Sequence, residues 1–257
     1  LVIIELTGNL HFEGVMLFFF VLAMFLILTG KWVLGTLPYA LSIGVKLFPL
    51  IFLPLILPLL GWKRSALFYL GTLIFLSLGI YPLYFPEFTA NYATTLKLWF
   101  SNFEFNAGLY SVVEWVAVWQ GAKPWEFIKA YGAVIPAITA LATLAVSAYP
   151  AMKQSKYWFT GALLVSCLYY FTATTVHPWY IIFPLLLGVF TNYRFVILWS
   201  ATVILSYAAY GRPDVPARPL MLLVEYLPVF GFLIYEILRN NKNLLLPVKN
   251  SRGNTPS

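Results

Sequence analysis

The sequence predicts an all-α fold, a polytopic bundle of transmembrane helices that forms a single domain over residues 1–239. Hydrophobic residues make up 61% of the 257-residue chain and charged residues only 10%, against about 25% in soluble domains. The mean hydropathy of +0.83 agrees with this composition. Apolar runs of about 18 residues recur along the chain, as they do in proteins whose helices cross a bilayer.

About seven to nine membrane segments are expected, and the first runs over residues 12–29. The next apolar stretch, residues 33–60, is interrupted by Lys46, Pro49, Pro54 and Pro58. Basic residues flank it on both sides, and cations favour the cytoplasmic side, so we expect a short broken hairpin that turns near Lys46–Pro49. Each arm is shorter than the roughly 20 residues of a full span. Broken helices of this kind occur where they are buried in protein or line a cavity.

The remaining segments are expected at residues 66–84, 126–149, 157–176, 179–191, 195–210 and 220–238. Residues 85–124 are too polar to lie wholly in a membrane. Within them, residues 107–119 are typical of an amphipathic helix at the outer interface. The polar tail, residues 240–257, is expected to be disordered and cytoplasmic.

The distribution of charge predicts the orientation of the chain. Ten of the sixteen cations fall on the side assigned to the cytoplasm: Lys31, Lys63, Arg64, Lys153, Lys156, Arg194, Arg239, Lys242, Lys249 and Arg252. Their grouping between apolar segments indicates topology rather than a nucleic-acid surface, so no nucleic-acid partner is expected. The prediction is an integral multi-pass protein of a bacterial cytoplasmic (inner) membrane.

The acidic residues and both histidines gather on the opposite, outer face. Seven of the nine acids fall there: Glu5, Glu13, Glu87, Glu104, Glu114, Glu126 and Asp214. His11 and His177 fall there too. A proton pump or channel would instead distribute acids through the depth of the membrane. The chemistry of this protein is therefore expected at its outer face.

The first candidate site residues lie where the first helix begins. Asn9, His11 and Glu13 are polar groups at the end of a membrane helix, a position where such groups are often functional. The macrodipole also favours an acid such as Glu13 near a helix N-terminus. His11 and Glu13 are two residues apart, so they point to different sides of a helix and need not form one site.

Lys46 is the sharpest single candidate. A lone cation in an apolar segment costs about 2.5–3.5 kcal/mol at the membrane centre. Snorkelling to the interface is the structural alternative. We expect Lys46 to face a cavity and to meet an anion such as a lipid phosphate, for which lysine serves as a point charge.

Two further regions carry candidate residues. Asn106 is expected to be the N-cap of the interfacial helix, and Glu104, flanked by aromatic residues, is a candidate for binding a sugar or a neighbouring cation. His177 closes one span beside Pro178, and its imidazole can exchange protons near pH 7 or bind phosphate as a cation.

Two acids keep a structural interpretation beside a functional one. Asp214, the only aspartate, lies in a turn that a local ion pair with Arg212 explains equally well. Glu225, inside the last span, is either the partner of a buried cation or an interfacial residue.

Several kinds of chemistry have no support in the sequence. It contains no G-x-x-x-x-G-K-[ST] phosphate loop, no H-E-x-x-H pair, no C-x-x-C pair and no G-x-S-x-G elbow. Cys167 is the single cysteine. No cofactor is indicated, and a divalent metal ion is neither indicated nor excluded.

Three stretches resemble bacterial polyprenol-phosphomannose-dependent mannosyltransferases, multi-pass enzymes of the GT-C glycosyltransferase superfamily. Leu1–Gly14, LVIIELTGNLHFEG, is similar to their E-x-x-x-N-x-H-[DE] stretch. Ala40–Pro49 is similar to their lysine–proline helix, and the sequence HPWY at 177–180 resembles their late outward-facing turn. The similarity covers roughly residues 1–210.

The resemblance implies transfer of a sugar, mannose in that family, from a polyprenyl-phosphate donor to a lipid-linked or glycan acceptor. It carries over Glu5, Asn9, His11, Glu13, Lys46, His177 and Tyr180 as substrate-binding residues. The family's catalytic base lies in an outer loop that would precede Leu1, so we expect an N-terminally truncated fragment, inactive alone. Within the chain the candidate bases are Glu13, Glu104 and Asp214. The alternatives are a lipid-linked sugar flippase or other transporter, and a non-catalytic membrane subunit.

Overall fold

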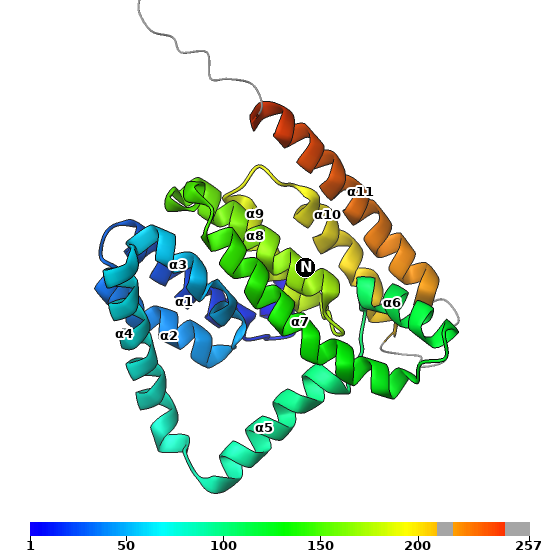
Figure 1. Cartoon of the computed structure of the whole chain (residues 1–257), viewed down its shortest axis with the longest axis horizontal. Helices are drawn as coiled ribbons and strands as arrows, with labels where there is room; N and C mark the ends of the chain where they lie inside the picture. The colour runs from blue at the N-terminus through cyan, green and yellow to red at the C-terminus, as the bar shows by residue number, and fades with distance from the viewer. Residues whose placement is uncertain (210–217, 245–257) are drawn as a thin grey trace, which may run out of the picture.

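The structure, a computed structural model, describes residues 1–209 and 218–244 (Figure 1). This part of the chain is helical and contains no strand, which confirms the predicted all-α class. Its α-helices are α1 (Glu13–Leu28), α2 (Trp32–Val45), α3 (Leu53–Leu60), α4 (Trp62–Ile80), α5 (Pro86–Ser101), α6 (Gly108–Trp119), α7 (Pro124–Ser147), α8 (Ser155–Thr172), α9 (Ile182–Val189), α10 (Phe195–Thr202) and α11 (Arg218–Leu244). Shorter helical turns are η1 (Ile3–Gly8), η2 (Phe48–Phe52), η3 (Tyr81–Leu83), η4 (Pro150–Lys153), η5 (Pro178–Ile181) and η6 (Val203–Ala209).

Three helical stretches in the described part are long and apolar enough to cross a membrane. They are Trp62–Leu83, Pro124–Ser147 and Pro219–Asn240. Most of their side chains are exposed rather than packed, as expected for helices that face lipid. The other predicted segments correspond to shorter apolar helices, or to α8 in the case of residues 157–176. That each of these also crosses the membrane stays a prediction.

The predicted break in the second apolar segment is present. Helix α2 ends at Lys46, whose backbone is extended with φ −150° and ψ 140°. The chain then re-enters helical structure through η2, where proline is tolerated because a first-turn N–H needs no helical partner. The Tyr39 hydroxyl donates a hydrogen bond of 2.9 Å to the carbonyl of Pro49, so this connection lies against α2.

The structure differs from the sequence predictions in two other segments, residues 85–124 and the start of the C-terminal tail. The polar stretch 85–124 contains α5 in addition to the expected helix α6, and Figure 1 shows α4 and α5 meeting in a V that points away from the other helices. Helix α11 continues to Leu244, so the first residues of the predicted tail are helical rather than disordered. Residues 245–257 lie outside the described residues.

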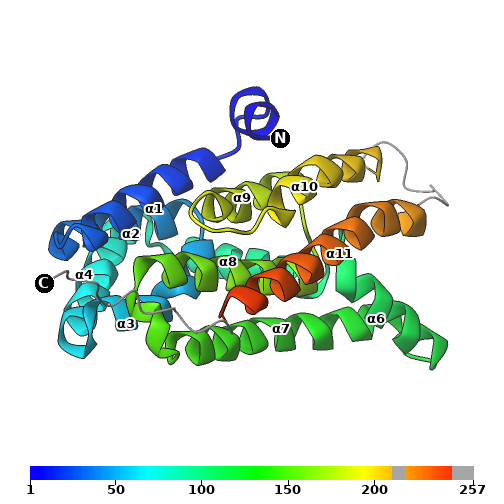
Figure 2. The same cartoon turned by 90° about the horizontal axis from the view of Figure 1, so that it is seen from above.

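Helix α8 forms the centre of the bundle. Figure 2 shows it between α9 and α10 on one side and α7 on the other. Ten of its side chains are buried, and the indole Nε1 of Trp158 donates a 2.8 Å hydrogen bond to the carbonyl of Leu55 in α3. This bond satisfies the only polar atom of a large buried side chain.

The hairpin of α1 and α2 packs closely because small residues lie at its contacts. A Cβ atom added to Gly35 would lie 3.2 Å from the carbonyl oxygen of Ala23 in α1. A Cβ at Gly71 in α4 would lie 3.1 Å from the Thr36 side chain in α2. Small residues at helix contacts are typical of membrane bundles.

Phe20 joins this hairpin to the rest of the core. Its ring is 1% exposed and lies 5.0 Å from the ring of Phe183 in α9 and 5.7 Å from that of Phe52, measured between ring centroids. The hairpin and α9 therefore share one aromatic cluster. Phe183 of this cluster also lines a cavity whose lining includes Lys46.

We expect Phe20→Ala to destabilise the protein by about 3–5 kcal/mol, because the cavity it leaves is surrounded by rings that cannot collapse into it. Phe18→Ala, on the same helix but with a 62% exposed side chain, is the matched control and should change little. Thermal unfolding in detergent micelles measures both. Equal melting temperatures for the two variants would contradict this description of the core.

Candidate functional site

The first residues of the chain fold into an unusual connection. A π-helix, η1, is followed by Leu10, whose φ of 55° lies in the left-handed region that non-glycine residues rarely adopt. The backbone N–H of His11 then donates to the Glu5 carbonyl at 3.0 Å. π-Helices and such backbone outliers occur frequently at functional sites.

Glu5 organises this connection. It is fully buried and accepts hydrogen bonds from the Asn9 amide at 3.1 Å and from the Tyr207 hydroxyl. His11 Nε2 lies 3.5 Å from Glu5 Oε2. The predicted residues Glu5, Asn9 and His11 therefore do come together, as a network that joins the N-terminal segment to η6.

Glu13 and Lys46 form an ion pair across the end of the α1–α2 hairpin, between Glu13 Oε1 and Lys46 Nζ. Glu13 is 2% exposed and Lys46 33%. Lys46 therefore meets an anion, as the sequence predicted, and in the structure that anion is a carboxylate of this protein. That it also meets a lipid phosphate stays a prediction. Lys46 Nζ also lies 5.4 Å from the centroid of the Tyr180 ring, a cation–π contact.

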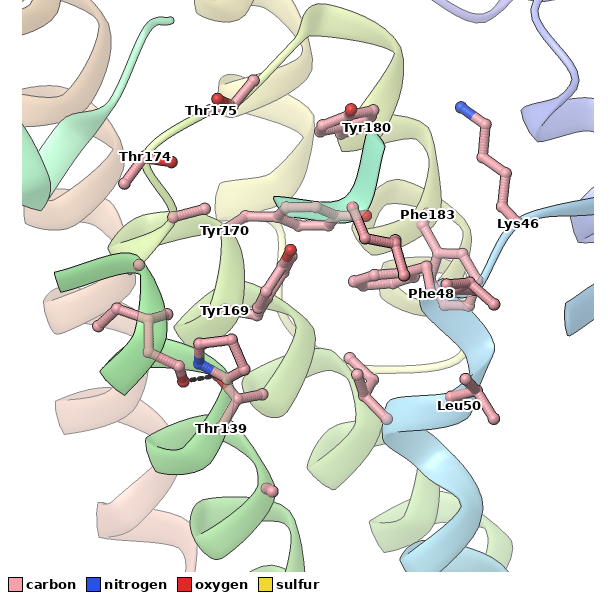
Figure 3. Close-up of a pocket in the computed structure, with 18 of the residues that line it drawn as sticks. Lys46, Phe48, Leu50, Thr139, Tyr169, Tyr170, Thr174, Thr175, Tyr180 and Phe183 are labelled. Atoms are coloured by element: carbon pink, nitrogen blue, oxygen red, sulfur yellow. Dashed lines mark hydrogen bonds between the residues drawn. The ribbon is translucent and has the colours of Figure 1, made fainter. Parts of the chain in front are cut away.

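The pair lines a cavity of about 580 Å³ between α7, α8, η2 and η5 (Figure 3). Lys46, Tyr180, Thr174 and Thr175 lie toward one end of the view, and Leu50 and Thr139 toward the other. Most of the remaining lining is apolar or aromatic: Met16, Leu47, Phe48, Ile51, Pro54, Leu96, Ile135, Pro136, Ala140, Tyr169, Tyr170, Ala173 and Phe183. The cavity therefore has a charged and hydroxylated end and a long apolar wall.

Beside this cavity, four aromatic rings form a stack. Trp179 lies between the two histidines, with ring centroids 3.8 Å from His11 and 4.4 Å from His177. Phe105 covers the other side of His177 at 4.8 Å. The stack brings His11 and His177 to one place, as their shared assignment to the outer face predicted. That this place faces outward stays a prediction.

His177 is neutral at pH 7. It is 4% exposed, and burial, together with the charges of Lys46 and His11, lowers its pKa to about 4. The sequence analysis allowed a histidine cation that binds phosphate. The structure corrects this, because the desolvated imidazole beside Lys46 does not take up a proton near neutral pH.

A loop from α5 to α6 closes this region. The backbone N–H of Phe105 donates a 3.0 Å hydrogen bond to the carbonyl of Thr174, and the N–H of Val176 donates a 2.8 Å bond to the carbonyl of Phe105. These two bonds form an isolated β-bridge. The Thr175 hydroxyl adds a bond of 2.9 Å to the carbonyl of Phe103. These bonds place the Phe105 ring on His177.

The residues that fix this loop correct two predictions. Asn106 is not a helix cap, because its amide donates to Glu225 at 3.1 Å and α6 begins after Ala107 without a side-chain cap. Glu225 pairs with no cation in the described residues. It accepts from Asn106 and from the Trp199 indole at 3.1 Å, both neutral donors.

Glu104 lies apart from Lys46, in a second cavity of about 280 Å³. Its lining combines two carboxylates, an amide, a lysine and aromatic rings: Asn102, Glu104, Tyr110, Glu114, Pro124, Trp125, Ile128 and Lys129. The Tyr110 hydroxyl donates to Glu114 at 3.0 Å. Asp214 lies outside the described residues.

Sequence reasoning found the polar residues and missed the groups around them. Tyr169, Tyr170 and Tyr207 carried no motif, and their roles follow only from contacts between distant helices. Within residues 1–209 and 218–244, no group of three His, Cys, Asp or Glu side chains is placed to hold a metal ion.

The neutral state of His177 predicts a pH dependence of stability. Between pH 6.5 and 4 the unfolded chain binds the histidine proton and the folded chain does not, so the free energy of unfolding falls as the pH falls through this window. We expect His177→Gln to lose less stability than the wild type between pH 7 and 5. Melting temperatures in micelles at the two pH values measure this, and an identical drop in both proteins would contradict it.

No family model, no curated protein and no solved structure matches this chain. The function is therefore argued from the geometry of the site. Its main features are a buried ion pair, an amphipathic cavity and a ring stack that holds two histidines.

Proposed function

We propose that the chain is the membrane-embedded part of a glycosyltransferase. It moves a sugar, mannose by the family resemblance, from a polyprenyl-phosphate donor to a lipid-linked or glycan acceptor at the outer membrane face. The observation that carries this proposal is the position of Lys46. Among the described residues that line the cavity it is the only cation, and it lies at the polar end of an otherwise apolar space.

The chemistry of the donor fits this arrangement. A polyprenyl phosphate joins a charged headgroup to a long hydrocarbon chain, so it needs a cation at one end and an apolar wall at the other. Lys46 supplies the cation, and the hydroxyl of Thr174 supplies a hydrogen-bond donor at the same end of the cavity. The apolar wall along α7 and η2 accepts the first isoprene units.

The cation also acts on the reaction itself. When the bond between the anomeric carbon and the phosphate oxygen breaks, negative charge grows on the leaving phosphate. A cation beside the leaving oxygen stabilises that charge more than it stabilises the bound donor, and this difference lowers the barrier. His177, being neutral, contributes hydrogen bonding and ring packing instead of charge.

Glu104 is assigned to the acceptor rather than to the donor. The second cavity offers carboxylate, amide and ammonium groups beside a Trp125 side chain that is 61% exposed. Sugar hydroxyls bind to such groups, and the apolar face of a sugar packs on an aromatic ring. The loop that carries Glu104 also carries Phe105, which lies on His177, so one loop would connect the two substrates.

We expect Lys46→Ala in the full-length protein to reduce sugar transfer from polyprenyl-phosphate mannose at least 100-fold, because the leaving phosphate loses its counter-charge. Lys123→Ala is the matched control. Lys123 also pairs with a glutamate, Glu126 at 3.1 Å, but both side chains of that pair are exposed. Radiolabelled mannose transferred to membrane acceptors measures the activity.

Wild-type turnover by Lys46→Ala would overturn the proposed function. A wild-type protein that binds the donor and moves it between leaflets without transferring sugar would overturn it in favour of a flippase. Membrane insertion and melting temperature are compared in parallel. These controls separate a loss of chemistry from a loss of folding.

A further inference from the structure

Only one of the two Glu13 oxygens is used by the protein. Glu13 Oε1 pairs with Lys46, while Glu13 Oε2 is buried and has no hydrogen-bond partner in the described structure. A buried acceptor without a partner costs about 1–3 kcal/mol, and more when it is charged. Glu13 lines the donor cavity, so this oxygen is available to a group bound there.

No donor among the described residues forms a hydrogen bond with Glu13 Oε2. The titratable groups beside the ion pair are Tyr170 in α8, which interacts electrostatically with Glu13, and Tyr180 in η5, whose ring contacts Lys46. Helix α9 carries no titratable side chain. His177 lies near both Lys46 and His11, and its burial and these charges keep it neutral at pH 7. Among the described residues, Lys46 is therefore the cation that balances the charge of Glu13.

This balance changes once a phosphate enters the cavity. The Glu13–Lys46 pair is neutral as a unit, so a phosphate adds negative charge that a single ammonium must share with the carboxylate. As the phosphate leaves the sugar its charge grows, and the ammonium is drawn further toward it. The Glu13 carboxylate then loses its counter-charge in a poorly solvated place, where it binds a proton more strongly.

We propose that Glu13 is the catalytic residue that accepts the proton of the acceptor hydroxyl. In the step, the O–H bond of the acceptor breaks and its proton moves to Glu13 Oε2. The acceptor oxygen forms a bond to the anomeric carbon, and the electron pair of the carbon–oxygen bond to phosphate leaves with the phosphate, beside Lys46. The total charge of the site is unchanged. This inference rests on the proposed function and adds a base within this chain.

The exchange of Lys46 between the two anions is the essential feature. The base becomes stronger in the same measure as the leaving group develops charge, so proton transfer and bond cleavage support each other. A base held permanently by its lysine would remain weak. Lys46 can make this movement because a third of its side chain is exposed, whereas Glu13 is fixed in the first turn of α1.

The test uses Glu13→Gln in the full-length protein, with binding and transfer of polyprenyl-phosphate mannose measured separately. Glutamine keeps the shape of the glutamate side chain, but it carries no charge to balance the Lys46 ammonium and it does not accept a proton. We expect donor binding to be equal or tighter, since Lys46 is released to the phosphate, and transfer to fall about 10²–10⁴-fold, the usual contribution of a general base. Glu126→Gln, at the exposed ion pair, is the matched control and should transfer normally.

The pH profile separates a base from a structural residue. If Glu13 is the base, the acidic limb of the wild-type pH–rate profile should be absent from the residual activity of Glu13→Gln. Glu13→Asp keeps a carboxylate on a shorter side chain and should restore part of the activity. If the glutamine variant fails to fold, the turnover of Glu13→Asp tests the role of Glu13 in its place.

Each outcome has one interpretation. Transfer by Glu13→Gln at the wild-type rate, or an unchanged acidic limb, would overturn the role of Glu13 and leave the glycosyltransferase proposal standing. If Glu13→Gln does not fold, an Asp variant with unchanged turnover and pH profile would overturn it equally. Failure of the wild-type protein to bind the donor would overturn both.

Discussion

The structure depends on the ion pair between Glu13 and Lys46. It joins the first turn of α1 to the residue at which α2 ends, and it is buried on the carboxylate side. Burying a charge costs several kcal/mol unless a partner compensates for it, and Lys46 supplies that compensation for the buried Glu13 carboxylate. The pair therefore holds the open end of the α1–α2 hairpin in one place, and with it the mouth of the cavity. A replacement by two apolar residues would fill the same space, but it would leave the polar end of the cavity without charge.

The fold was predictable to the extent that it follows from local patterns. Apolar runs predicted the helices. The break after α2 was predicted because basic residues flank the segment on both sides and Pro49 follows Lys46, and proline disfavours a helix interior. Helix α5 was missed because Glu87 and Lys97 make Pro86–Ser101 look like a polar connection, although its residues form a regular helix. Three helices are long and apolar enough to span a membrane. The shorter ones cannot be assigned from length, because the position of a broken helix is set by its neighbours.

The candidate site was predictable in its residues and not in its geometry. Glu5, His11, Glu13, Lys46 and His177 stood out because polar groups are rare in such an apolar chain. Their partners could not be read from the sequence, since the contacts that matter join residues far apart. Tyr207 reaches Glu5 across 202 positions, and Glu225 reaches Asn106 across 119. Charge states were equally hidden, because the burial that keeps His177 neutral is a property of the packed stack. The separation of Glu104 into another cavity likewise required the folded loop.

The proposals share one premise, that the polar end of the cavity selects a phosphate and its apolar wall selects the attached hydrocarbon. Native mass spectrometry of the full-length protein in micelles tests this premise directly, with a polyprenyl phosphate and the corresponding neutral polyprenol offered in turn. We expect one bound polyprenyl phosphate per protein, weak retention of the polyprenol, and loss of the preference in Lys46→Ala. Equal retention of both lipids, or an unchanged preference in the variant, would contradict it.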